Sequence, residues 1–104
     1  MLVAPVAFAN LVAMCSMVIS PVDYFTVDVR GLLFMPSQSH AVEAVQSQFP
    51  PECGQFLEPQ NLSCGLIGPS SFSQVCYFET KRFGAFYTKL DFMDTLHVLH
   101  INWD

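Results

Sequence analysis

The sequence predicts an α+β fold: an N-terminal apolar helix, one early strand, one short helix and a C-terminal three-stranded antiparallel meander. Three observations lead to this prediction. The first 22 residues contain no Asp, Glu, Lys, Arg or His, two regions alternate between apolar and polar residues, and turn-forming residues crowd between positions 50 and 73. We therefore expect an apolar helix over residues 1–22, followed by a small α+β domain over residues 23–104.

The uncharged stretch at the start is apolar except for Pro5, Asn10, Ser16, Ser20 and Pro21. Roughly 20 apolar residues can cross the hydrocarbon of a bilayer, so a membrane anchor is one interpretation. A helix buried in the protein core is the second. A cleaved signal peptide is the third, but the stretch has no basic start and its cleavage sites are poor. We expect a retained helix, either membrane anchor or core helix.

Two short elements are predicted between this helix and position 50. Tyr24–Arg30 alternates, with Phe25, Val27 and Val29 on one face, and this pattern indicates a half-buried strand. Over Ser37–Phe49 the apolar residues recur at helical spacing, so we expect a short amphipathic helix. The two prolines at positions 50 and 51 would end it, because a residue before proline avoids the helical region.

An irregular loop is predicted over residues 50–73, where Pro, Gly and Ser are frequent. Cys53 and Cys64 lie in this loop, and a disulfide between them is reasonable if the chain enters an oxidising compartment; otherwise we expect buried thiols. Asn61 begins an Asn-Leu-Ser sequon, so it is a candidate N-glycosylation site under the same condition.

The last third of the chain predicts the meander. The expected strands are Val75–Thr80, Ala85–Phe92 and Leu96–Trp103, joined by short connections that favour antiparallel pairing. In the second strand the alternation separates Phe86, Thr88, Leu90 and Phe92 from Tyr87, Lys89 and Asp91.

Charge and motifs exclude several function classes. The net charge is −5 with only four Lys and Arg, which argues against binding of nucleic acid, because that needs cations to neutralise phosphates. His97 and His100 could share a metal on a helix, but on a strand they point to opposite faces. No nucleophile, phosphate-binding or metalloprotease motif occurs. We predict no catalytic residue, no metal, no cofactor and no enzymatic activity.

The surplus of aromatic residues is the remaining functional signal. Phe83, Phe86, Tyr87 and Trp103 lie in a sheet too small to bury both faces under one short helix, so they are a candidate binding surface. The leading hypothesis is a small membrane-anchored or exported binding or structural protein, in a membrane or the secretory pathway, with a membrane or protein partner.

Two alternatives stay open at this point. The chain could be a soluble cytoplasmic subunit whose apolar surface is buried by a partner or by homo-oligomerisation. It could also be the product of an open reading frame with no selected function, since low charge and abundant Phe, Ser and Cys suit such a frame.

Overall fold

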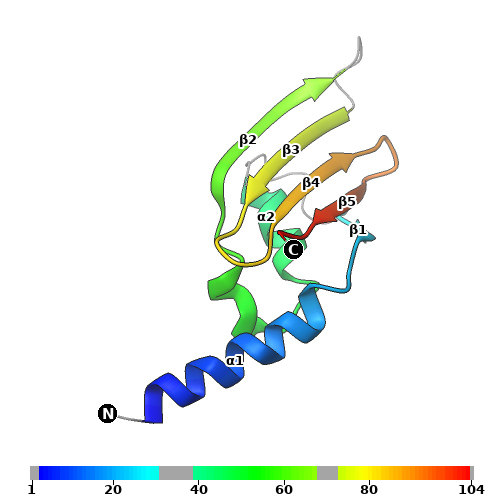
Figure 1. Ribbon diagram of the computed structural model, residues 1–104. Coiled ribbons are helices and arrows are strands. Elements are labelled where there is room, and N and C mark those ends of the chain that lie inside the picture. The colour runs from blue at the N-terminus through cyan, green and yellow to red at the C-terminus, as the bar shows by residue number, and fades with distance from the viewer. Residues whose placement is uncertain (1–2, 31–38, 68–72, 104) are drawn as a thin grey trace.

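The computed structural model describes residues 3–30, 39–67 and 73–103 (Figure 1). It has an α+β fold, as the sequence predicts, with two α-helices, one 3-10 helix and five strands in the described ranges. In chain order these are α1 (Val3–Ile19), β1 (Tyr24–Asp28), α2 (Ser39–Gln46), η2 (Pro51–Phe56), β2 (Gln60–Ile67), β3 (Ser73–Glu79), β4 (Ala85–Leu90) and β5 (Thr95–Ile101).

The five strands form one antiparallel sheet in the order β1-β5-β4-β3-β2. The predicted C-terminal meander is confirmed as β3, β4 and β5, and the early strand β1 pairs with β5 at one edge. Strands β1 and β5, which lie far apart in the sequence, therefore pair at this edge, where Tyr24 lies opposite Leu99. At the other edge β2 pairs with β3.

Strand β2 corrects the expectation that residues 50–73 form an irregular loop. The sequence signal was present, because Leu62 and Cys64 alternate with Asn61, Ser63 and Gly65. In the structure the first two are half-buried and the other three are exposed. This alternation is typical of a half-buried strand. Turn-forming residues at either end of the segment favoured the prediction of a loop. Pairing with β3 nevertheless stabilises β2 as a strand.

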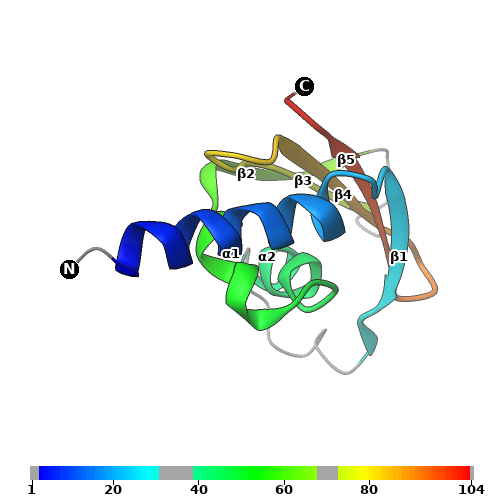
Figure 2. The ribbon, with the colours of Figure 1, turned by 60° about the horizontal axis from the view of Figure 1, so that its bottom comes forward.

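Helices α1, α2 and η2 lie on the same side of the sheet (Figure 2). Aromatic rings join the layers: the ring centroid of Phe49 is 5.9 Å from that of Phe25 and 6.4 Å from that of Phe86. Phe78 stacks on Phe86 at 5.2 Å within the sheet. The core is therefore aromatic and lies between the sheet and the helices.

Helix α2 is shorter than the predicted Ser37–Phe49, whose first two residues lie outside the described ranges. Its apolar stripe is confirmed, since Val42, Val45 and Phe49 are buried. After the helix, the N–H of Phe49 donates to the carbonyl of Gln46 in a tight turn (3.2 Å). The helix needs this docked stripe because so few residues form a marginal helix alone.

Helix α1 joins the core through its C-terminal half. Cys15 and Ile19 are fully buried, whereas Phe8 and Met17 remain exposed. The N-terminal end extends away from the sheet (Figure 1), and the guanidinium of Arg82 lies over the Phe8 ring at 5.4 Å. In the part of the chain that the structure describes, no helix is long and apolar enough to cross a membrane.

Gly84 holds the turn between β3 and β4, and its replacement tests that turn. Its φ is +97°, and a Cβ built there would lie 1.9 Å from the carbonyl oxygen of Ile101. Gly84→Ala is therefore expected to lower the free energy of unfolding by more than about 1 kcal/mol. Urea denaturation measures the change. Gly65→Ala is the matched control, because nothing lies within 4 Å of its added Cβ, and a similar loss there would contradict the steric explanation.

Candidate functional site

The sheet face opposite the helices is the candidate functional surface. We call it the outer face and define it by Tyr24, Tyr77, Tyr87, Leu99 and Ile101. The first four form one row across β1, β5, β4 and β3, because Tyr24 pairs with Leu99, Leu99 with Tyr87, and Tyr87 with Tyr77. Side chains paired in this way lie close enough to form a continuous surface.

Large apolar side chains are exposed on the outer face. The exposed fraction is 57% for Tyr24, 48% for Leu99, 45% for Ile101 and 41% for Tyr87. Their neighbours along the same strands, such as Val98 and Phe86, point inward and are completely buried. The outer face thus exposes apolar area that folding of this chain does not cover.

A hydrogen-bonded relay lies at the β1 end of the outer face. The hydroxyl of Tyr24 is 2.6 Å from Nδ1 of His97, and Nε2 of His97 is 2.7 Å from Oδ2 of Asp91. A carboxylate can only accept hydrogen bonds. In the neutral ring Nε2–H therefore donates to Asp91, and Nδ1 accepts a hydrogen bond from the Tyr24 hydroxyl. The relay ties β1 to β5 and to the β4–β5 turn.

The carboxylate of Asp91 is held in its charged form. The hydrogen bond from His97 lowers the pKa of Asp91 below its ordinary value, and the backbone N–H groups of Thr95 and Met93 add to this effect. Their nitrogens lie 3.1 Å and 2.8 Å from Oδ1. One carboxylate therefore organises both the relay and the turn.

This arrangement predicts a pH-dependent contribution of Asp91 to stability. Because the folded pKa is lowered, the unfolded chain binds more protons in acid, so the contribution is present above about pH 4 and is lost as the pH falls through the folded pKa. Asp91→Asn should therefore lower the melting temperature at neutral pH and have little effect in strong acid. Thermal unfolding at both pH values measures it, with the exposed Glu58→Gln as control. A pH-independent difference would contradict the prediction.

A second polar cluster lies at the β2 end of the outer face. Glu79 accepts hydrogen bonds from Tyr77 and Asn61, with the Tyr77 hydroxyl oxygen 2.5 Å from Oε2 and the Asn61 Nδ2 2.5 Å from Oε1. The bond to Glu79 raises the pKa of Tyr77 to about 12, and the same bond lowers the pKa of Glu79. The ring of Tyr87 lies 4.7 Å from that of Tyr77.

His97 and His100 lie on opposite faces of β5, as the alternation predicts. His100 is buried and stacks on Phe86 at 4.4 Å. Its Nδ1 lies 2.7 Å from the carbonyl oxygen of Val22, and its Nε2 contacts the carbonyl oxygen of Phe83. Both nitrogens are thus occupied by backbone groups, so His100 has a structural role. Among the described residues, no group of three or more His, Cys, Asp and Glu could hold a metal ion.

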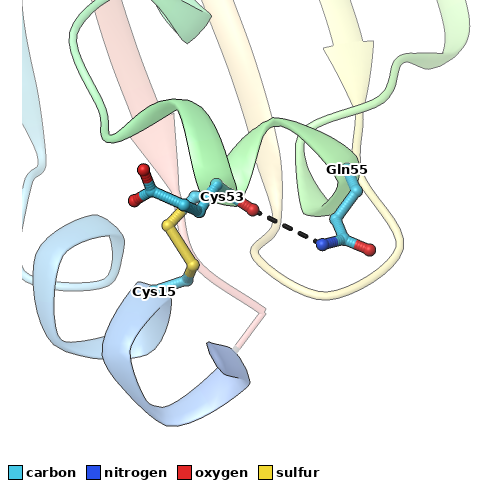
Figure 3. The surroundings of a disulfide bond; sticks show 4 residues. Cys15, Cys53 and Gln55 are labelled. Atoms are coloured by element: carbon cyan, nitrogen blue, oxygen red, sulfur yellow. Dashed lines mark hydrogen bonds between the residues drawn. A yellow bond between two sulfur atoms is a disulfide. The ribbon is translucent and has the colours of Figure 1, made fainter. Parts of the chain in front are cut away.

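All four cysteines form disulfides, Cys15–Cys53 and Cys64–Cys76. The prediction of disulfides is confirmed, but the predicted Cys53–Cys64 pair is wrong. Cys64 lies on β2 directly opposite Cys76 on β3, with Cα atoms 4.1 Å apart. Cys53 lies on η2 and faces α1 (Figure 3). The error followed from placing both cysteines in one loop, whereas they belong to separate elements.

The four residues predicted as a binding surface do not lie together on the exterior. Phe83 and Phe86 are buried, which is a correction, while Tyr87 and Trp103 are exposed. Trp103 also donates from Nε1 to the carbonyl of Thr80 at 3.1 Å. Tyr24, Leu99 and Ile101 were missed. Alternation separates Tyr24 from Phe25, and Leu99 and Ile101 from Val98, and the structure buries the Val98 face of β5.

Asn61, the predicted glycosylation site, is exposed and lies on β2 rather than in a loop.

Comparisons with protein-family models, curated proteins and solved structures find no match to this chain.

Proposed function

We propose that this chain is a small disulfide-stapled protein of an extracellular or secretory compartment that binds a protein partner through its outer face and has no catalytic role. The observation that carries the proposal is the exposure of Tyr24, Tyr87, Leu99 and Ile101 on one continuous sheet face. Aromatic and aliphatic side chains gathered in this way are typical of the centre of protein–protein interfaces.

The disulfides support the proposed compartment. The Cα atoms of Cys15 and Cys53 lie 5.7 Å apart, within the usual range for a disulfide. Cys64 and Cys76 are bonded between directly opposite positions of β2 and β3, and no cysteine is left free. Disulfides persist in oxidising compartments and are rare where thiols are kept reduced. Helix α1 takes part in this linkage through Cys15, so the proposal keeps α1 in the mature protein.

The polar groups of the outer face support binding of a protein rather than of lipid. His97, Asp91 and Glu79 lie beside the exposed apolar row and offer hydrogen-bonding groups around it. An apolar centre with a polar rim is the usual anatomy of a protein interface. A tyrosine contributes apolar area and a hydroxyl at a low cost in conformational entropy.

Site-specific photo-crosslinking tests the proposal. A photoreactive amino acid replaces Leu99 on the outer face, or Glu43 on the exposed side of α2 as control, in the full chain produced by secreting cells. A discrete crosslink from position 99, absent from position 43 and lost in Ile101→Ala with an unchanged melting temperature, would support binding at this face.

Two results would overturn the proposal. Equal crosslinking from both positions would mean that the outer face is not a specific surface. Recovery of the endogenous chain with four reduced thiols in the cytosol would contradict the proposed compartment.

Light scattering on the purified chain tests whether the partner is a second copy of this chain. A dimer that dissociates in Leu99→Lys would show that it is.

A further inference from the structure

We propose that Asn61 carries an N-linked glycan whose first sugar packs against the Tyr77 ring and is oriented by Glu79. The inference rests on the proposed secretory compartment, because N-glycosylation takes place there. It adds a modification site to the outer face, at the end where β2 forms the edge of the sheet.

The sequence and the backbone both suit Asn61 as the acceptor. The chain has three asparagines, Asn10, Asn61 and Asn102, and only Asn61 has Ser or Thr two positions later. Asn61 is exposed, with a φ of +56°, at an irregularity in the β2–β3 register between Gln60 and Ser63. Asparagine is among the residues that tolerate this conformation best.

The modification itself is a balanced group transfer. A bond forms between Nδ2 of Asn61 and C1 of the first N-acetylglucosamine of a lipid-linked oligosaccharide, the donor. The bond between C1 and the donor's diphosphate oxygen breaks, and the lipid diphosphate leaves with its electron pair. One Nδ2 proton is lost to a base of the transferase. The second N–H of the amide remains, so it can still donate to Glu79.

Glu79 orients the sugar in the folded protein. Its Oε1 lies 2.5 Å from Nδ2 of Asn61, and its Oε2 lies 2.5 Å from the Tyr77 hydroxyl oxygen. Because both groups bind one carboxylate, the sugar that is bonded to Nδ2 begins beside the Tyr77 ring. Glu79 keeps its charge at neutral pH, since the hydrogen bonds from Tyr77 and Asn61 lower its pKa.

The two tyrosines supply a surface for the sugar. Tyr77 and Tyr87 lie with ring centroids 4.7 Å apart and ring planes inclined by 52°. An aromatic face carries partial negative charge and attracts the polarised C–H groups of a pyranose ring. The glycan would thus cover the Tyr77 end of the row and leave Tyr24 and Leu99, on β1 and β5, free for the protein partner.

Intact mass spectrometry of the secreted chain tests the modification. The full chain is produced in human cells, both with its own N-terminus and behind an added cleavable secretion signal. We expect one glycan, removable by peptide-N-glycosidase, that is lost in Asn61→Gln and Ser63→Ala and kept in Ser63→Thr. A secreted, fully oxidised chain with unmodified Asn61 would overturn the inference and leave the proposed compartment intact. Glycosylation only behind the added signal would support the site and count against the proposed export.

Nuclear magnetic resonance tests the packing. With the glycan trimmed to one N-acetylglucosamine, we expect nuclear Overhauser effects between its protons and the Tyr77 ring, together with an upfield ring-current shift. This wild-type measurement needs no variant. The shift should disappear in Tyr77→Leu and persist in Tyr24→Leu, because Tyr24 lies on the opposite edge strand. Sugar protons at their free-peptide positions in the wild type would overturn the packing.

Discussion

Replacing both Cys15 and Cys53 with alanine is expected to lower the free energy of unfolding by about 4 kcal/mol. The two cysteines are separated by 38 residues, so their disulfide removes the entropy of a long loop from the unfolded chain. Both are fully buried, and the linkage holds α1 against η2 (Figure 3). Urea denaturation of the oxidised wild type and of the double variant measures the difference.

The Cys64–Cys76 pair is the matched control for this prediction. It closes a loop with a sequence separation of only 12, so its double alanine variant should lose about 3 kcal/mol, less than the first pair. The reverse order would contradict the loop-entropy argument. Peptide mapping of the oxidised chain checks the pairing itself, and a peptide joining Cys53 to Cys64 would contradict the structure.

Phe86→Ala is expected to lower the free energy of unfolding by about 4 kcal/mol, because the lost ring leaves a cavity at the centre of the core. Phe86 is completely buried and its ring contacts those of Phe49, Phe78 and His100. It therefore joins the sheet to the segment that follows α2. Urea denaturation again provides the measurement.

Phe92→Ala is the control with the same chemical change at an exposed position. The Phe92 side chain is 80% exposed, so its removal should change the free energy of unfolding by less than about 0.5 kcal/mol. Equal losses in the two variants would mean that burial does not determine the effect. The comparison also bears on the sequence prediction, which put both residues on the same strand face.

Much of the sheet could be predicted from alternation alone. The strands around Phe86, Val98 and Phe25 were expected from their period, and the structure pairs them as β4, β5 and β1. Strand β2 was missed because Pro59 and Gly65 suggested turns, although Leu62 and Cys64 alternate with polar neighbours. Local propensity is a weak guide to an edge strand, whose stability comes from pairing with its neighbour.

The candidate site was harder to predict than the sheet. Alternation separates Phe86 from Tyr87, and His100 from Leu99, but both faces of the meander contain large apolar residues. The sequence therefore could not say which face the helices cover. Phe83 and Phe86 were assigned to the binding surface because the aromatic residues exceed what one short helix could cover, but the structure buries both.

By itself, the sequence determined the α+β class, the meander, the two faces of β4 and β5 and the sequon at Asn61. These features depend on local order along the chain, because period and turn residues act over a few positions. Only the tertiary structure decided the disulfide partners, the buried face of the sheet and the meeting of Tyr24 with His97. Each of these depends on contacts between residues that are distant in sequence, such as Cys15 and Cys53. Such contacts form only when α1 and β1 pack against elements from later in the chain.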